Sequence, residues 1–257
     1  MISRKTTMLA ILSLIAANLV ASAYFLYNDY QCKNAPIDLT ISTIGDSLTD
    51  AGHYGTEVRC GAEIRDCYQY YTYKYLKNHN LNALVRNLGI SGQSISQICG
   101  RLNSTIPANY TVCMGGTNDI WRADYSAPGI NDTLANRIIG KYNDTIFNTI
   151  AYQQSLGYAA PVFVICSIPP FGKVTPPVYY DPHIINTIKY VNAELRSYVE
   201  GLNNPGILFC DVHDAMSTSD GYMIDGLCYA DGVHFTMAGD QVMGETVARI
   251  IWSHYST

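Results

Sequence analysis

Short apolar segments rich in β-branched residues alternate with longer amphipathic segments along most of this chain of 257 residues. The short segments have the composition of buried strands, and the longer ones repeat apolar residues at the spacing of a helix face. The predicted strands lie at residues 39–44, 83–88, 110–114, 161–168 and 207–210, and the predicted helices at 68–77, 94–102, 132–156, 182–202 and 237–254. In the first of these helices tyrosines alternate with polar residues, which also permits a strand. Because strands that alternate with helices usually form a parallel sheet covered on both faces, we predict one three-layer α/β domain with a mainly parallel, five-stranded sheet.

The first predicted strand ends in the turn Gly45-Asp46-Ser47. Gly45 allows the chain to bend sharply as it leaves the strand. Ser47 then lies beyond the carboxyl end of a strand, which is the edge of an open α/β sheet where ligands bind. A serine at this edge can act as a nucleophile if a base reaches it. The alternative is that Asp46 and Ser47 only cap backbone groups of the turn.

Polar turns follow other predicted strands as well. They occupy residues 87–92 (Asn-Leu-Gly-Ile-Ser-Gly), 115–119 (Gly-Gly-Thr-Asn-Asp) and 211–214 (Asp-Val-His-Asp), and Asp231-Gly-Val-His234 precedes the last predicted helix. Because parallel strands bring their carboxyl ends to one edge of the sheet, these groups can converge there. Asp231 can then hold one ring nitrogen of His234 while the other nitrogen takes a proton from Ser47. The alternative is that the Asp-x-x-His turn only caps the last helix.

Together these motifs resemble the sequence blocks of the SGNH hydrolases, also called the GDSL esterase/lipase family. Residues 45–48 (Gly-Asp-Ser-Leu) match the first block, residues 87–92 the second, residues 115–119 the third and residues 231–234 the last. All four occur in the family's order, and the resemblance spans about residues 38–254. It implies a flavodoxin-like α/β/α fold over a single domain, residues 36–257.

The resemblance also implies the roles of individual residues. Ser47 is the expected nucleophile, His234 the general base and then acid, and Asp231 the partner that orients His234. The expected oxyanion hole combines the backbone N–H groups of Ser47 and Gly92 with the side-chain amide of Asn118. Acyl transfer needs such donors because negative charge develops on the carbonyl oxygen in the transition state.

Three further residues compete for these roles. Gly89 is the alternative to Gly92 in the second block. His213, which lies between two aspartates near a predicted strand end, and His183 are alternative bases. Neither histidine lies in the block that corresponds to the family's last one.

The N-terminus has the pattern of a secretory signal peptide. Two basic residues precede an uncharged apolar run at residues 8–20, and the triplet Ala-Ser-Ala at 21–23 offers a cleavage site. We therefore expect residues 1–23 to be removed and the protein to be secreted or to lie on the extracellular or periplasmic side. The alternative is an uncleaved membrane anchor at residues 8–26, which places the rest of the chain on the same side.

Eight cysteines fit an oxidising compartment and permit a disulfide framework. Cys60 and Cys67 flank a short polar loop, and we predict a bridge between them. Cys113, Cys166 and Cys210 lie in apolar strand-like runs, where each is either a small buried hydrophobe or half of a bridge. No C-x-x-C pair occurs, so a structural zinc site is not expected.

Four Asn-x-Ser/Thr triplets begin at Asn103, Asn109, Asn131 and Asn143. Such triplets are glycosylation acceptors on exposed loops of secreted proteins, although Asn109 abuts a predicted strand. The net charge of −5 and the absence of a basic run after Lys5 argue against nucleic acid as a partner. The sequence has no metalloprotease, nucleotide-loop or EF-hand pattern, and no cofactor or metal is expected.

The resemblance implies a serine ester hydrolase, and the N-terminal pattern predicts that it acts outside the cytoplasm. Its expected substrate is a small ester or an acylated glycan, from which it removes acetyl or other short acyl groups. One alternative is a lipase or lysophospholipase that acts on lipid esters, which suits an anchored protein. Another is a surface glycan-binding protein that has the same fold and no activity, because a fold alone does not determine function. Contact with a membrane is expected only through the N-terminal segment.

Overall fold

The computed structural model describes residues 4–60, 64–173 and 182–257. The chain divides into two compact units, Met1–Pro36 and Ile37–Thr257. Most of the first unit is one helix, α1 (Arg4–Asn34). Within the described residues, no helix contains a stretch that is long and apolar enough to cross a membrane. Residues 1–3 of the expected signal peptide lie outside the described residues, and its cleavage stays a prediction.

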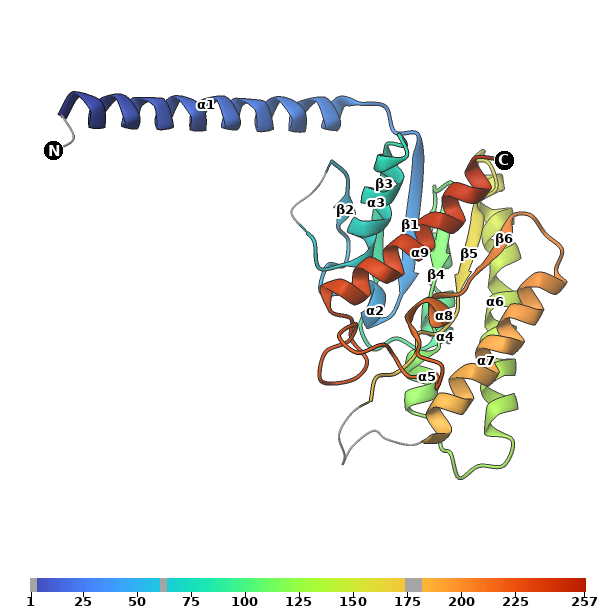
Figure 1. Ribbon diagram of the computed structural model, residues 1–257. Coiled ribbons are helices and arrows are strands. Elements are labelled where there is room, and N and C mark those ends of the chain that lie inside the picture. The colour runs from blue at the N-terminus through green and yellow to red at the C-terminus, as the bar shows by residue number, and fades with distance from the viewer. Residues whose placement is uncertain (1–3, 61–63, 174–181) are drawn as a thin grey trace. The chain divides into compact units, whose positions relative to one another are not determined.

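The second unit is built on a six-stranded sheet with the strand order β2-β3-β1-β4-β5-β6 (Figure 1). The strands are β1 (Leu39–Gly45), β2 (Glu57–Val58), β3 (Ala83–Gly89), β4 (Tyr110–Cys113), β5 (Val162–Cys166) and β6 (Ile207–Cys210). All neighbouring strands are parallel except β2 and β3. The expected mainly parallel α/β sheet is therefore confirmed.

Helices cover both faces of this sheet. They are α2 (Ser47–Asp50), α3 (Tyr68–Asn78), α4 (Ile95–Cys99), α5 (Thr117–Trp121), α6 (Ile130–Ser155), α7 (Pro182–Gly201), α8 (Val212–Met216) and α9 (Met237–Tyr255), with the 3-10 turn η1 (Leu102–Thr105). Helix α3 packs against α9, and α6 packs against α7 (Figure 1). Because both faces are covered, β4 is buried along its whole length, as its apolar sequence predicts.

The register of the central strands brings their carboxyl ends level. Gly45 at the end of β1 is paired with Gly89 at the end of β3, and Ile44 is paired with Cys113 at the end of β4. The turns that follow these three strands therefore begin at the same edge of the sheet. This register is what allows groups far apart in the sequence to meet there.

The sheet has one strand more than the sequence predicts. Strand β2 pairs antiparallel with β3 and places Glu57 opposite Arg86, and Arg86 Nε lies 3.2 Å from Glu57 Oε1. Strand β2 is only two residues long and lies in a segment that reads as a polar loop. A strand this short has no periodicity that the sequence could reveal.

The predicted helices also differ in detail from those in the structure. Residues 68–77 form a helix, so the strand alternative there is wrong. Of the helix predicted at residues 94–102, only Ile95–Cys99 are helical, as α4, and the 3-10 turn η1 begins at Leu102. Helices α2, α5 and α8 follow strand ends and were not expected, because each is about one turn long and shows no amphipathic repeat.

The expected bridge between Cys60 and Cys67 is wrong. Cys60 is disulfide-bonded, whereas Cys67 is a free thiol that is fully buried. Cys67 is the N-cap of α3 and packs in the core, and this burial takes it away from the polar loop. Three of the residues between the two cysteines, 61–63, lie outside the described residues.

The other apolar cysteines behave as small hydrophobic residues. Cys113, Cys166 and Cys210 are free thiols, and all three are fully buried in the core. Burial raises the pKa of the Cys113 thiol well above its usual range. Of the two interpretations of these strand cysteines, the structure therefore supports the buried hydrophobe.

The four glycosylation triplets do not all lie on loops. Asn103 is in η1, and Asn131 and Asn143 are in α6. Asn109 lies just before β4, where its Oδ1 accepts a hydrogen bond from the backbone N–H of Thr40 at 2.7 Å. Glycosylation at these positions stays a prediction.

Candidate active site

Ser47 is the first residue of α2 and lies directly beyond the end of β1. The turn requires glycine before Asp46, because a Cβ there would lie 2.1 Å from Thr49 Oγ1 and 2.7 Å from the backbone oxygen of Met114. Asp46 is the N-cap of α2, and its Oδ1 accepts a hydrogen bond of 3.1 Å from a backbone N–H two residues later. Asp46 thus caps the turn, which leaves the side chain of Ser47 available to another element.

The carboxyl group of Asp46 is fully buried. Burial raises the pKa of Asp46 to about 6, while the backbone N–H of Leu48, the hydroxyl of Thr117 and the charge of His234 act in the opposite direction. Its second oxygen, Oδ2, has no hydrogen-bond partner among the described residues. A buried carboxyl with a raised pKa beside a candidate nucleophile is typical of functional sites.

The side chains of Ser47, His234 and Asp231 form a continuous hydrogen-bonded chain. Ser47 Oγ lies 3.0 Å from His234 Nε2, and His234 Nδ1 lies 2.7 Å from Asp231 Oδ2. The structure therefore brings together the three residues that the sequence motifs single out. In this arrangement the imidazole can accept the hydroxyl proton on one nitrogen while its other nitrogen donates to a carboxylate.

The turn that carries Asp231 and His234 is held by its own backbone. Asp231 Oδ1 accepts from the N–H groups of Val233 at 2.9 Å and of His234 at 3.0 Å. Burial raises the pKa of Asp231, but these hydrogen bonds and the imidazole outweigh it and hold the pKa below its usual value. The N-cap of α9 is Thr236, whose side chain accepts from the backbone N–H of Gly239. The Asp-x-x-His turn is therefore not the cap of the last helix.

The backbone N–H groups of Ser47 and Gly92 are available as donors. Within the described part of the chain, neither group donates to a protein acceptor. Gly92 has a φ of 78°, a conformation that favours glycine. The alternative glycine is already engaged, because the N–H of Gly89 donates to Asn87 Oδ1 at 3.0 Å. The geometry thus favours Gly92 over Gly89 as an oxyanion donor.

Asn118 lies in the first turn of α5 and is 8% exposed. Its Nδ2 donates one hydrogen bond to the backbone oxygen of Gln93 at 3.1 Å. An amide nitrogen carries two hydrogens, so a second donor remains. This contact also ties the turn after β4 to the turn that contains Gly92.

Four side chains that the sequence did not single out hold these two turns. Asp119 Oδ2 accepts from the backbone N–H of Ile95 at 2.7 Å. The guanidinium of Arg101 donates to Gln93 Oε1 at 2.9 and 2.7 Å. Asp50 Oδ2 accepts from Ser91 Oγ at 2.6 Å, and Arg122 Nη1 donates to the backbone oxygen of Gly92 at 3.2 Å. In the sequence, Asp119 follows Asn118 and Gln93 follows Gly92. This adjacency to predicted oxyanion-hole residues was the only sequence signal that Asp119 and Gln93 belong to the site.

Neither alternative histidine joins the site. His213 is in α8, where burial and then the charge of Lys189 lower its pKa, and the aspartate before α8 caps that helix. The ring of His183 stacks on Tyr125 with centroids 6.5 Å apart. Among the described residues, no group of three or more His, Cys, Asp or Glu is arranged to hold a metal ion.

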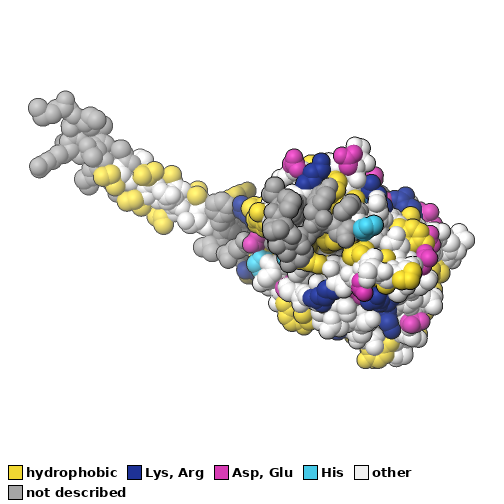
Figure 2. All heavy atoms as spheres, turned by 90° about the horizontal axis from the view of Figure 1, so that it is seen from below, with side chains coloured by type: hydrophobic (Ala, Val, Ile, Leu, Met, Phe, Trp, Pro, Cys, Tyr) yellow, Lys and Arg dark blue, Asp and Glu magenta, His cyan; other side chains and the backbone are white. Residues whose placement is uncertain are grey.

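A cavity of about 260 Å³ opens beside Ser47 and His234. Its other lining residues are Leu48, Ala51, Gly52, Asp66, Ser91, Tyr229, Phe235 and Asp240. Figure 2 shows the molecule from below, from the edge at which the strands of Figure 1 end. On the described part of this face, basic and acidic side chains are interspersed, and Lys and Arg do not dominate any large area.

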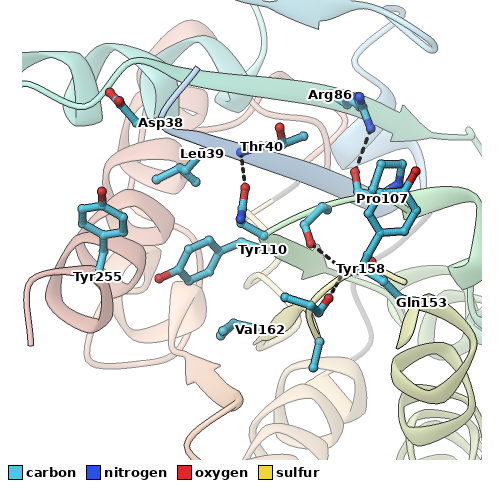
Figure 3. Close-up of a pocket in the computed structure, with 14 residues that line it drawn as sticks. Asp38, Leu39, Thr40, Arg86, Pro107, Tyr110, Gln153, Tyr158, Val162 and Tyr255 are labelled. Atoms are coloured by element: carbon cyan, nitrogen blue, oxygen red, sulfur yellow. Dashed lines mark hydrogen bonds between the residues drawn. The ribbon is translucent and has the colours of Figure 1, made fainter. Parts of the chain in front are cut away.

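A larger cavity of about 470 Å³ lies at the opposite edge of the sheet (Figure 3). It is lined by residues at the amino ends of β1, β4 and β5, and in it Arg86 Nη1 donates to the backbone oxygen of Pro107 at 3.0 Å. It contains none of the residues predicted for the catalytic triad or the oxyanion hole. Because ligands of open α/β sheets bind at the carboxyl ends of the strands, the smaller cavity is the candidate active site.

Comparisons with known proteins agree with this geometry. A profile of the GDSL-like lipase/acylhydrolase family matches residues 43–242. No curated protein matches the chain. Many solved structures have a similar fold.

One is an acetylxylan esterase from Geobacillus stearothermophilus, with a TM-score of 0.58 and 21% identity over 84% of this chain and 94% of that one. A carbohydrate acetylesterase from Sinorhizobium meliloti has a TM-score of 0.56 and 16% identity over 84% and 99% of the two chains. A GDSL-like lipase from Bacteroides thetaiotaomicron has a TM-score of 0.57 and 17% identity over 85% and 91%. At these identities the likeness establishes the fold alone. The profile, however, covers most of the chain, and the protein therefore belongs to the GDSL-like lipase/acylhydrolase family.

Proposed function

We propose that this protein is a serine-dependent carboxylic ester hydrolase that removes acetyl or other short acyl groups from a carbohydrate or small ester. The observation that carries the proposal is the hydrogen-bonded chain from Ser47 through His234 to Asp231. Its two links measure 3.0 and 2.7 Å, and it borders a cavity at the carboxyl edge of the sheet. The first link is within the range over which a proton can be transferred, and the second is a hydrogen bond that can orient the imidazole and stabilise its charge.

In the first half of the reaction, Ser47 Oγ attacks the ester carbonyl carbon. His234 Nε2 takes the hydroxyl proton as the bond forms, and Asp231 stabilises the resulting imidazolium through Nδ1. The C–O bond to the alcohol then breaks, and His234 returns the proton to the departing oxygen. The acyl group remains as an ester on Ser47.

The negative charge that develops on the carbonyl oxygen needs donors that are in place beforehand. The backbone N–H groups of Ser47 and Gly92 have no protein acceptor among the described residues, and Asn118 has one amide hydrogen to spare. Preorganised donors of this kind stabilise the transition state because they do not reorient during the reaction. Arg101 and Arg122 position this group of donors through their contacts with Gln93 and Gly92.

In the second half, water replaces the alcohol. His234 Nε2 removes a proton from the water, the hydroxide attacks the acyl carbon, and the proton passes back to Ser47 Oγ as the acid leaves. The same residues thus act twice, and no cofactor takes part in either step.

Two observations support a short acyl group and a carbohydrate or small alcohol. The cavity beside Ser47 carries two carboxyl side chains, Asp66 and Asp240, which can accept hydrogen bonds from the hydroxyls of a carbohydrate, whereas burying an apolar alcohol against them is unfavourable. Among the similar folds are an acetylxylan esterase and a carbohydrate acetylesterase. The alternatives, a lipase and a glycan-binding protein without activity, are outcomes that the experiment below distinguishes.

Action outside the cytoplasm is part of the proposal. The apolar N-terminal segment with its Ala-Ser-Ala triplet supports export, and the disulfide-bonded Cys60 is typical of an oxidising compartment. Protein isolated from its native host is expected to begin at or near Tyr24. Detection of residues 1–23 on mature, membrane-bound protein by mass spectrometry would contradict cleavage.

The function is tested by a panel of esters with the parent protein and Ser47→Ala. p-Nitrophenyl esters of increasing acyl length and acetylated sugars are compared by kcat/KM. We expect the highest values for acetyl and other short acyl groups, and loss of activity in Ser47→Ala. A preference for long chains indicates a lipase instead, and no turnover of any ester by the folded parent indicates the binding protein.

A further inference from the structure

Asp240 is a buried carboxyl group in the wall of the cavity that contains Ser47 and His234. It lies in the first turn of α9 and is only 4% exposed. Its place is fixed by tight packing of the preceding residue, because a Cβ on Gly239 would lie 2.1 Å from the backbone oxygen of Leu227. The backbone at this end of α9 is therefore held close to Leu227.

The charge of Asp240 is only partly balanced by the protein. A backbone N–H, that of Tyr68 at the start of α3, lowers the pKa of Asp240, but burial and the neighbouring Asp66 raise it to about 7. Asp66 has its own partner, since His53 Nε2 lies 2.9 Å from Asp66 Oδ1. In the described part of the chain no cationic side chain forms an ion pair with Asp240. The cavity therefore presents a carboxyl group with acceptor capacity left over.

The cavity lies on the side of the reaction from which the alcohol departs. His234, which hands the proton to the departing oxygen, lines it together with Tyr229 and Phe235. Gly92 and Asn118, the donors proposed for the carbonyl oxygen, are not part of its lining. The alcohol portion of the ester thus lies next to Asp240.

We propose that Asp240 determines specificity for the leaving alcohol by accepting a hydrogen bond from a hydroxyl of a polyhydroxylated, sugar-like alcohol. This inference rests on the proposed ester hydrolysis and names the alcohol that the same site recognises. A purely aliphatic alcohol would bury this carboxyl group without a new partner, which is costly. The carboxyl group of Asp240 titrates near neutrality, and a hydroxyl can donate to its ionised form and accept from its protonated form. An ammonium group can only donate, so it suits the ionised form alone. The exposed ring of Tyr229 offers an apolar surface beside it.

The test compares Asp240→Leu, which has a similar size but no hydrogen-bond acceptor, with the parent on three acetate esters that share the acyl group. These are an acetylated methyl glycoside with free neighbouring hydroxyls, p-nitrophenyl acetate and acetylcholine. We expect kcat/KM for the glycoside to fall at least tenfold more than that for p-nitrophenyl acetate, because only the glycoside has a hydroxyl to lose. The matched control is Asp144→Leu, which removes an exposed carboxyl of α6 outside the cavity and should leave all three values unchanged.

Two results would overturn the inference. Equal losses on the glycoside and on p-nitrophenyl acetate would show that Asp240 only stabilises the start of α3. A larger loss on acetylcholine than on the glycoside would show that the group recognises a cation. Binding of the deacetylated methyl glycoside, followed by saturation-transfer NMR, separates this inference from the proposed function. Weaker binding to Asp240→Leu than to the parent supports the role of Asp240 even if no ester is hydrolysed, and equal binding contradicts it.

Discussion

Replacing Asn118 by alanine tests the proposed oxyanion hole at the residue whose geometry is most specific. The amide is 8% exposed, and one of its hydrogens is held by the backbone oxygen of Gln93 at 3.1 Å. The remaining hydrogen has no other task in the resting protein, so Asn118→Ala removes one donor from the transition state. Loss of one such donor lowers kcat by roughly 10²- to 10³-fold, which is about 2.7–4 kcal/mol.

The same substitution has a smaller effect on stability. The lost contact with Gln93 is one neutral hydrogen bond, which contributes about 1 kcal/mol. KM should change much less than kcat, because the amide interacts with the carbonyl oxygen mainly after charge has developed on it.

The assay is steady-state hydrolysis of p-nitrophenyl acetate, with circular dichroism to show that the variant is folded. Asn148→Ala is the matched control, because Asn148 is an exposed asparagine of α6 that donates only to the backbone oxygen of Asp144. We expect this control to retain the kcat of the parent. An unchanged kcat in folded Asn118→Ala would refute the reasoning, and a rise in KM at constant kcat would place Asn118 in ground-state binding instead.

Three further predictions concern the stability of the fold, its pH dependence and the reactivity of two cysteines. Gly45→Ala should lower the free energy of unfolding, measured by urea titration, by about 1–3 kcal/mol, because the alanine Cβ would lie 2.7 Å from the backbone oxygen of Met114. An unchanged unfolding midpoint would contradict this. Asp46→Asn should flatten the pH dependence of stability. The pKa of Asp46 is raised from 3.8 to about 6 in the folded protein, so its favourable contribution is present below 3.8 and is lost, by up to about 3 kcal/mol, as the pH rises through 6. Parallel stability curves for variant and parent between pH 4 and 7 would argue against it. In the folded protein, the partly exposed Cys228 should react with iodoacetamide much faster than Cys67, because burial raises the pKa of the Cys67 thiol to about 11. Mass spectrometry of the labelled native protein measures the two rates, and rapid labelling of Cys67 would contradict the prediction.

The strands, the long helices and their parallel arrangement were predictable because each depends on a local pattern. Residues 39–44 and 110–114 are rich in apolar and β-branched residues and carry no charge, which suits a strand covered on both faces. The same argument explains why β2 was missed. Its two residues, Glu57 and Val58, pair with Arg86 and Val85 of β3, which lie far from them in the sequence.

The residues of the candidate site also fall into those that a local sequence motif predicts and those that it does not. Ser47 and His234 lie in short motifs that the sequence displays directly, and the structure links their side chains at 3.0 Å. Arg101 and Asp240 carry no motif. Arg101 reaches the site through Gln93, and Asp240 reaches it because α9 packs against α3. Such residues are defined by tertiary contacts, which a single sequence does not reveal.

The failed disulfide prediction has the same physical cause. The spacing of Cys60 and Cys67 suggested a local bridge, but spacing says nothing about which side of the chain faces the core. Cys67 is the N-cap of α3 and is fully buried. Because Cys67 is buried in the core together with α3, it does not form the predicted disulfide with Cys60.

The central claim is that Ser47, activated by His234, forms a covalent acyl-enzyme. The most direct measurement is labelling of the intact protein with an organophosphonate probe, followed by peptide mapping by mass spectrometry. The account predicts one phosphonate on the peptide that contains Ser47 and no label in Ser47→Ala. It also predicts that His234→Ala is labelled more slowly by orders of magnitude, because that variant lacks the proton acceptor 3.0 Å from Ser47 Oγ. Labelling of a different serine in the parent, or equal rates in the parent and His234→Ala, would contradict it.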